Sequence, residues 1–404
     1  MRSAVPAIQS TSLHHSSTLA LLTHVCHCSG GRYGEHLSKE QVAELIAPPS
    51  DVPSLVNAWL EHHGVLPSTV LTKHGGSRLV LMGVPVSRAN DLLGASYQLY
   101  QHSETNMTVL RTLSYGLPEA LREHVQTVMP TTHFGFPRTS RQKPHLRSGG
   151  AREAHAKVPA GELEAALSSR QIPIARVTPD FLRWLYRTSA YVPTAPDFNV
   201  IGIAGFQYEY PSPTDLMQFM RQFRADATYA TYSVALVNGG AYNPNNPAQE
   251  PNLDIQFSLG IAYPTRLIFY STSESPDALV AWLDYVLDQL LVPQTISCSY
   301  GLPEYQVPPD YAVHACNLFA QIAVRGGSVL ASSGDDGVGD GNCLFQDNSG
   351  NLFVRFRATF PSTCTCSISL CLNAIHNPQL TTLATLSKVP GSPALVQPQA
   401  TTRR

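Results

Sequence analysis

The hydrophobic and polar positions of residues 176–360 alternate between two periods. Short apolar runs, the pattern of buried strands, occupy residues 200–206, 233–237, 266–270, 295–300 and 328–333. Between these runs, apolar residues recur at helical spacing over residues 216–223, 279–290 and 315–322. Strands that alternate with helices in this way predict an α/β fold with a mostly parallel sheet flanked by helices.

Residues 31–137 carry a different mixture of patterns. Ser38 is a suitable cap for a first helix, and a second helical pattern follows around Val56 and Leu60. Residues 78–84 read as a strand and residues 86–93 as another helix. These short helices and strands predict a small, separate α+β domain in front of the sheet-containing region.

The remaining stretches lack regular periodicity. Residues 138–175 are rich in Arg, Lys, Ser, Gly and Ala and bury little apolar surface. We interpret them as a linker, which is a natural place for proteolytic processing. Residues 1–30 and the tail from about residue 365 are predicted to be irregular. The sequence thus divides into regions 1–30, 31–137, 138–175 and 176–404.

Composition narrows the classes of function. The formal net charge is -2 and only 14% of the 404 residues are charged, which argues against a nucleic-acid partner. No apolar run is long enough for a membrane span. Arg2 is followed by a Ser- and His-rich stretch, and the apolar run 19–22 is short. The chain therefore shows no convincing signal peptide.

The cysteines and histidines give weaker signals. Most of the eight cysteines lie after residue 297, which fits an oxidising compartment with local disulfides. Cys343 and Cys364 flank a loop and are one candidate pair, although the sequence does not fix the connectivity. A cluster in the least patterned region could bind a soft metal but is too weak to assign a metal site: His24, Cys26, His27 and Cys28. Three further histidines are interpreted as surface residues: His62, His63 and His74.

Two acidic residues are candidates for acid–base chemistry. Glu250 and Asp254 are four residues apart, which places both carboxylates on one face of a helix. Leu253, Phe257 and Ile261 would then take the opposite side. Residues 253–261 also alternate, so a strand stays open as an interpretation. Two like charges held close raise the pKa of one of them, which suits a general base, whereas a solvated acidic helix start is the simpler alternative.

A third acidic candidate follows the last predicted strand. Asp335 lies in SSGDDGVGD, where an apolar run enters a Gly-rich acidic loop. Active sites of parallel sheets lie at such strand ends, so Asp335 could bind a metal or, if protonated, donate a hydrogen bond. A simple turn is the alternative, because Asp-Gly is ordinary turn chemistry.

Taken together, these segments resemble the sedolisin (serine-carboxyl peptidase, S53) family, and in particular its fungal tripeptidyl-peptidase branch. That family combines an E-x-x-x-D motif, a strand-end Ser-Gly-Asp motif and a Gly-Thr-Ser motif. Glu250 and Asp254 match the first motif within EPNLDIQ, and Asp335 matches the second within SSGDDGVGDG. Three segments resemble the family propeptide, a pro-kumamolisin-like activation domain: RYGEHLSKEQV, LVNAWLEHHGV and LLGASYQLY. VTPDFLRWLY resembles the start of the mature domain, and the resemblance covers roughly residues 31–364.

The resemblance implies a subtilisin-like parallel sheet, here incomplete, after a propeptide domain. It implies an acid-acting serine-type peptidase that is made as a zymogen and hydrolyses peptides or proteins as a tripeptidyl-peptidase or an endopeptidase. Glu250 would accept the proton of the serine, Asp254 would steady Glu250, and Asp335 would donate to the oxyanion. The propeptide would act as an intramolecular inhibitor, and the location would be extracellular or vacuolar.

Two features depart from the family pattern. No Gly-Thr-Ser follows Asp335, so no nucleophilic serine is found, and the Asp residues of the family's calcium site are missing as well. Pro251 follows Glu250 and fixes the backbone beside the presumed base, which a first helical turn allows. We therefore expect a C-terminally truncated proenzyme whose 404 residues alone show no turnover. The alternatives are a faulty gene model, a non-catalytic pseudoenzyme or a propeptide-type inhibitor.

Overall fold

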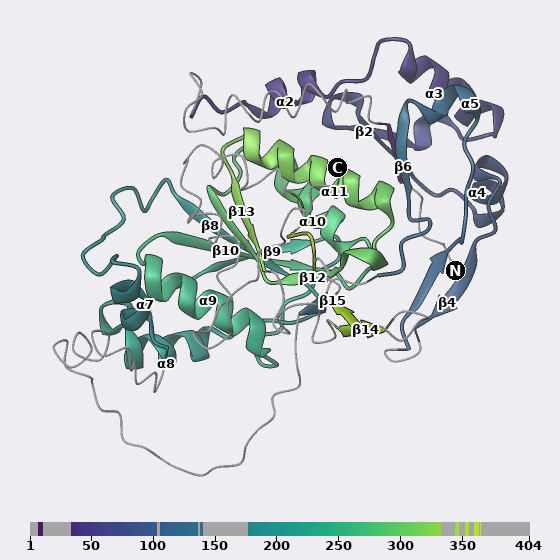
Figure 1. The fold of residues 1–404 in the computed structure, drawn as a ribbon. Coiled ribbons are helices and arrows are strands. Elements are labelled where there is room, and N and C mark those ends of the chain that lie inside the picture. Colours follow the sequence, from purple (N-terminus) through teal and green to yellow (C-terminus); the bar gives the residue numbers. More distant parts are fainter. Residues whose placement is uncertain are drawn as a thin grey trace, which may run out of the picture.

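The structure is a computed structural model in which residues 7–10, 34–102, 106–135, 138–139, 177–332, 344–346, 352–354, 359–362 and 364 are described. Its centre is a five-stranded sheet in which every neighbouring pair is parallel (Figure 1). The strand order is β13-β11-β8-β10-β9. The strands are β8 (Val200–Gly205), β9 (Ser233–Val237), β10 (Arg266–Thr272), β11 (Thr295–Cys298) and β13 (Ser328–Ala331). The predicted parallel sheet is thereby confirmed.

Helices cover both faces of this sheet (Figure 1). On one face lie α7 (Pro179–Leu185), α8 (Pro213–Phe223) and α9 (Gln249–Ala262), and on the other lie α10 (Ala278–Asp288) and α11 (Pro309–Val324). Each face of the sheet has its own hydrophobic core, and neighbouring residues of β8 pack into different cores. Ile203 packs with α8 and α9, whereas Ala204 packs with α10 and α11. Such alternation is what a strand buried on both faces requires. At the start of α8, Pro213 is the first residue and the Ser212 hydroxyl accepts from the amide of Asp215.

The N-terminal unit has its own sheet and its own core. An antiparallel sheet of order β2-β3-β1-β6 is formed by β1 (Ala7–Ser10), β2 (Val70–Lys73), β3 (Arg78–Leu81) and β6 (Val125–Met129). The helices are α2 (Lys39–Leu45), α3 (Val52–His62), α4 (Val86–Leu93) and α5 (Glu119–Arg122), and β4 (Gln98–Gln101) pairs with β5 (Thr108–Arg111). Residues 1–30 are predicted to be irregular, yet residues 7–10 form β1 between β3 and β6.

Smaller elements connect these parts. The 3-10 helices are η1 (Pro67–Thr69), η2 (His74–Gly76), η3 (Ala225–Ala227) and η4 (Glu304–Gln306). The remaining strands are β7 (Arg138–Thr139), β12 (Tyr300–Pro303), β14 (Leu344–Gln346), β15 (Leu352–Val354) and β16 (Thr359–Phe360). Residues 295–300 are predicted as one strand, but the chain leaves the parallel sheet after Cys298 and enters β12, which pairs with β7 and β16. Ser299 therefore lies at the carboxyl end of a central strand.

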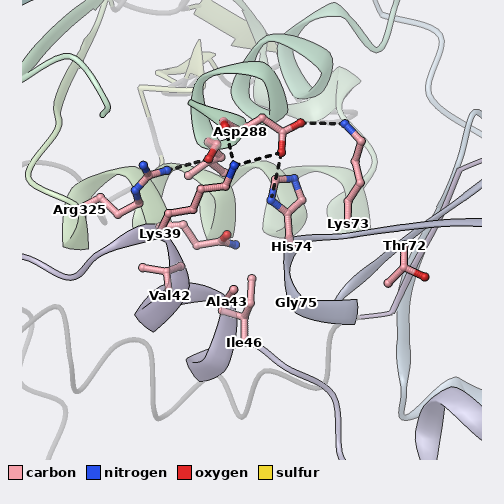
Figure 2. A pocket seen from close by; sticks show the side chains of 12 residues that line it. Lys39, Val42, Ala43, Ile46, Thr72, Lys73, His74, Gly75, Asp288 and Arg325 are labelled. Carbon is pink, nitrogen blue, oxygen red and sulfur yellow. Dashed lines mark hydrogen bonds and ion pairs between the residues drawn. The ribbon is translucent and has the colours of Figure 1, made fainter. Parts of the chain in front are cut away.

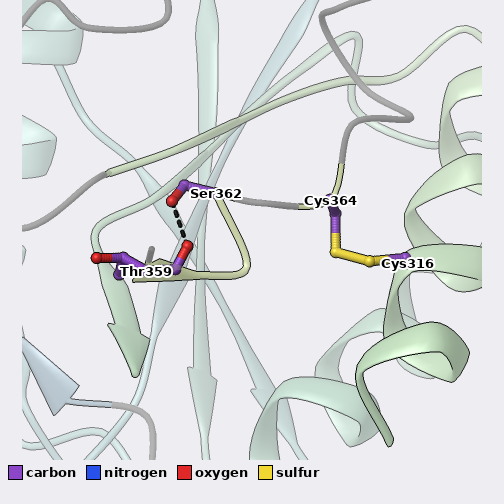
Figure 3. Close-up of a disulfide and its surroundings, with 4 residues drawn as sticks. All are labelled: Cys316, Thr359, Ser362 and Cys364. Atoms are coloured by element: carbon purple, nitrogen blue, oxygen red, sulfur yellow. Dashed lines mark hydrogen bonds between the residues drawn. A yellow bond between two sulfur atoms is a disulfide. The ribbon is translucent and has the colours of Figure 1, made fainter. Parts of the chain in front are cut away.

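A disulfide joins α11 to the segment after β16. Figure 3 shows Cys316 bonded to Cys364, beside the turn in which the Ser362 hydroxyl donates to the carbonyl of Thr359. The candidate pair Cys343–Cys364 is therefore wrong, because the Cys364 sulfur is already committed to Cys316. Cys316 lies on the side of α11 that faces the segment after β16. The positions of cysteines on either side of a loop do not reveal this contact.

The N-terminal unit is not as separate as its sequence suggests. Val42 and Ile46 pack with Ala320, Ala323 and Val324 in one buried cluster, so α2 lies directly on α11. The unit also contacts both ends of α10. Arg111 Nη2 donates to Asp277 Oδ2 at 2.7 Å just before the helix, and Lys73 Nζ donates to Asp288 Oδ2 at 2.7 Å at its last residue.

A cavity of about 240 Å³ lies where the unit meets the end of α10 (Figure 2). His74 lines it, and the interpretation of His74 as a surface residue is wrong: its side chain is 8% exposed and its Nε2 lies 3.4 Å from Asp284 Oδ1. The tight turn of η2, in which His74 has a φ of 49°, directs the ring toward α10. Burial lowers the pKa of His74 to about 4, so the ring is neutral at neutral pH. His62 is exposed and His63 is half-buried.

Among the described helices, none combines the length and the apolar character that crossing a bilayer requires.

Candidate active site

Glu250 and Asp254 lie on the first two turns of α9, so the segment is a helix and not a strand. Its buried side is formed by Pro251, Ile255 and Leu259. The predicted apolar side is wrong, since Leu253 is 46% exposed and Ile261 is 38% exposed. At about 3.6 residues per turn, Leu253, Phe257 and Ile261 fall on the same side of α9 as Glu250 and Asp254, so they cannot form an opposite, buried side.

Asp254 is half-buried, and within the described residues its carboxylate accepts one hydrogen bond. The Ser299 hydroxyl donates to Asp254 Oδ1 at 2.9 Å, whereas Oδ2 is buried without a hydrogen-bond partner in the described part of the chain. Burial raises the pKa of Asp254 to about 7, and the negative charge of Glu250 adds to the increase. The hydrogen bond from Ser299 acts in the opposite direction, and the more distant charge of Glu209 raises the pKa further.

A third carboxylate, that of Glu209, pairs with a tyrosine beside this site. Tyr300 donates its hydroxyl proton to Glu209 Oε2 at 3.0 Å. The side chain of Tyr300 is buried, and its ring meets that of Phe206 edge-on with centroids 5.1 Å apart. Burial, followed by the charge of Glu209, raises the pKa of Tyr300 well above its ordinary value, so the phenol stays a donor.

Three elements therefore bring acidic and hydroxyl groups together. Glu250 and Asp254 come from the start of α9, Glu209 follows β8, and Ser299 and Tyr300 follow β11. The carboxyl ends of parallel strands meet at one edge of a sheet, which is where such folds place their sites. With one carboxyl whose pKa is raised beside another, the arrangement can hold a proton near neutral pH and keep a neighbouring carboxylate ionised.

Sequence spacing does not reveal Glu209, Ser299 or Tyr300. The available signal is the SCSY run at the end of a central strand, because polar residues at such an end point to the site edge of the sheet. Asp335 lies outside the described residues, so its place near the pair stays a prediction. In the part of the chain that is described, no group of three or more His, Cys, Asp or Glu side chains is arranged to hold a metal ion.

The chain is similar to known proteins over both of its units. Residues 11–134 match the family model of the pro-kumamolisin activation domain. The chain is 31% identical over 353 residues to a probable tripeptidyl-peptidase SED3 of Arthroderma benhamiae, with 82% of this chain and 56% of that protein covered. It is 31% identical over 356 residues to tripeptidyl-peptidase SED2 of Arthroderma otae, with 82% of this chain and 57% of that protein covered.

The chain spans little more than half the length of these relatives. A solved structure of Pseudomonas sedolisin, a serine-carboxyl proteinase, covers 47% of this chain at 24% identity with a TM-score of 0.35. The activation-domain match and the long alignments to the tripeptidyl-peptidases agree with the motifs in the sequence. The chain therefore belongs to the sedolisin family and carries a pro-kumamolisin activation domain in its N-terminal unit.

Proposed function

We propose that this protein acts as an acid-acting serine-type peptidase made as a zymogen, with Glu250 as general base and Asp254 as its partner. The observation that carries the proposal is the burial of Asp254 beside Glu250, which raises the pKa of Asp254 to about 7. In mild acid Asp254 is then protonated and can donate to the carboxylate of Glu250. That donation favours the ionised form of Glu250, the form that can accept a proton from a serine hydroxyl.

The substrate would be a peptide with a free N-terminus, and the reaction would be the release of tripeptides. The names of the relatives support this choice over endopeptidase cleavage. Asp335 would donate a hydrogen bond to the oxyanion, a role that needs the protonated carboxyl and therefore acid. The serine nucleophile is not assigned to any residue. Calcium is the cofactor that the family resemblance implies, but the described residues offer no set of ligands for it.

The N-terminal unit would act as an intramolecular inhibitor. Arg111 and Lys73 bind the two ends of α10, which supports a propeptide that is docked on the sheet domain. It would stay docked until the acidic groups or histidines at this contact change charge. The Cys316–Cys364 bond supports an extracellular or vacuolar location, since disulfides persist in oxidising compartments.

Peptide hydrolysis tests the proposal. The 404-residue chain, and a version extended through the downstream reading frame of its gene, are incubated in acid with a fluorogenic tripeptide substrate and with its N-acetylated form. We expect no turnover from the 404 residues alone and cleavage of only the free peptide by the extended version. In that version Glu250→Gln lowers kcat by about 10³-fold because the base is lost. The exposed Glu304→Gln serves as the matched control and keeps full activity.

Absence of cleavage by both proteins contradicts the proposal, as does full activity of Glu250→Gln. In that case the competing interpretation, a pseudoenzyme or a propeptide-type inhibitor, accounts for the missing Gly-Thr-Ser. Cleavage of the acetylated peptide at the same rate would instead indicate an endopeptidase.

A further inference from the structure

Ser299 occupies the one-residue break between two sheets. Its predecessor Cys298 ends β11 in the parallel sheet, and its successor Tyr300 begins β12 in a different sheet. The backbone on both sides is fixed by strand pairing, and the hydrogen bond to Asp254 holds the hydroxyl. The hydroxyl therefore has a defined position at the carboxyl end of β11, across from the start of α9.

The hydroxyl of Ser299 selects between the two oxygens of Asp254. It donates to Oδ1 at 2.9 Å, while Oδ2 is buried and has no hydrogen-bond partner among the described residues. A hydroxyl that already donates to Oδ1 disfavours a proton on that oxygen, because a protonated oxygen is a weaker acceptor. When Asp254 takes up a proton, the proton therefore belongs on Oδ2.

The other groups around Asp254 do not determine which of its two oxygens holds the proton. Tyr300 directs its hydroxyl to Glu209 at 3.0 Å, and the Cys298 thiol lies 3.6 Å from the carbonyl of Tyr300. Glu209 and Glu250 act on Asp254 as negative charges and thus favour its protonation. Glu250 is one helical turn from Asp254, and its charge acts on the Asp254 carboxyl, so the two carboxyl groups are neighbours on one side of α9.

We propose that Ser299 is a positioning residue of this site: it fixes Oδ1 of Asp254 and so directs the proton on Oδ2 toward the carboxylate of Glu250. The inference rests on the proposed function for its chemical purpose, which is to keep Glu250 ionised as the base. Its geometry stands without that function, because it concerns only which oxygen of Asp254 holds the proton.

Removal of the hydroxyl has a specific consequence. Ionised Asp254 loses a donor, so its pKa rises by about half to one pH unit in Ser299→Ala, the shift expected for one ordinary hydrogen bond. Ser299→Thr keeps a hydroxyl and restores the parent pKa. Ser297→Ala is the matched control, since Ser297 lies on β11 two residues earlier and its side chain forms no hydrogen bond with the residues that the structure describes.

The experiment is a titration of the 404-residue chain carrying 13C-labelled aspartate carboxyls, followed by NMR. The Asp254 signal is assigned by its loss in Asp254→Asn. We expect the upward shift in Ser299→Ala and no shift in Ser299→Thr or Ser297→Ala. If Ser299→Ala unfolds, the Asp254 titration is measured in Ser299→Cys instead. A thiol fills the space of the hydroxyl but is a weak donor, so we expect the same upward shift in the pKa of Asp254.

An unchanged Asp254 titration in the folded Ala or Cys variant overturns the proposal, as does an equal shift in Ser297→Ala. This titration needs no peptidase activity, so its failure is separate from failure of the proposed function. If the extended version cleaves peptides, the acidic limb of its kcat/KM profile should move to higher pH in Ser299→Ala while KM stays unchanged. A merely structural role for Ser299 would not move that limb.

Discussion

At the residue scale, burial and charge both oppose ionisation of Asp254. Its pKa is about 7 in the folded protein against an ordinary value of 3.8, so the folded state binds more protons than the unfolded state between these values. Stability must therefore fall as the pH rises through this range, the reverse of the usual behaviour of a carboxylate in an ion pair. A residue that costs stability at neutral pH, and whose Oδ2 is nonetheless buried, fits a role in chemistry better than a role in folding.

Replacement of Asp254 by asparagine tests this cost. Asp254→Asn keeps the shape and the acceptor for Ser299 but cannot ionise. We expect a gain in the free energy of unfolding of about 2–4 kcal/mol near pH 8 and almost no gain near pH 4. Urea unfolding at both pH values measures it. Asp226→Asn is the control with the opposite sign, because Arg224 lowers the pKa of Asp226. No gain for Asp254→Asn in alkaline conditions would show that Asp254 ionises freely.

At the element scale, the Cys316–Cys364 bond ties α11 to the segment after β16. The two residues are 48 positions apart, so the bond closes a long loop in the unfolded chain. In the loop-entropy picture such a closure contributes about 4 kcal/mol to the free energy of unfolding.

Cys316→Ser should lose most of that stabilisation, whereas Cys343→Ser leaves the bond intact and should change the melting temperature little. Thermal unfolding with and without reductant measures both. If Cys343→Ser is the variant that loses stability, the pairing deduced from the loop flanks is correct after all.

Elements that bury one regular face were predictable from sequence. The helices α4, α8, α10 and α11 follow their apolar spacing, and Gly94, with a φ of 54°, ends α4 as a left-handed cap. The buried side of α9 was not predictable, because apolar residues occur on several of its sides. Glu250 and Asp254 are visible because their relation is local. Ser299 reaches Asp254 across 45 residues, and Tyr300 reaches Glu209 across 91, so only the fold reveals these contacts.

At the scale of the whole molecule, buried polar groups concentrate where the activation domain meets the sheet domain. Arg78 forms an ion pair with Asp284, and His133 stacks on Tyr311 with ring centroids 4.0 Å apart. Burial is the main cause that lowers the pKa of His133 to about 4 and that of His314 to about 3. His74, with a pKa of about 4, belongs to the same set. This contact between the two units is therefore assembled from histidines that are neutral when buried.

The sign of the resulting pH dependence follows from linkage. These histidines have lower pKa values in the folded protein than the ordinary 6.5, so the unfolded or opened state binds more protons in acid. The stability of the assembled units is present above about pH 6.5 and is lost as the pH falls toward about 4. Acid should loosen the activation domain at the same pH at which the proposed catalytic carboxyls become competent.

His314→Leu tests this dependence. His314 is 2% exposed, and neither ring nitrogen has a hydrogen-bond partner among the described residues. Leucine therefore removes the group that must be protonated without breaking a hydrogen bond to those residues. Near pH 4 the variant should be more stable than the parent by about 3 kcal/mol, and near pH 7 the two should be similar. Urea unfolding gives the stabilities, and hydrogen exchange in α2 reports whether the activation domain opens.

The exposed His62→Gln is the control and should keep the parent's pH dependence. Equal acid sensitivity of His314→Leu and the parent would place the acid-sensitive group elsewhere, with His74 and His133 the next residues to replace.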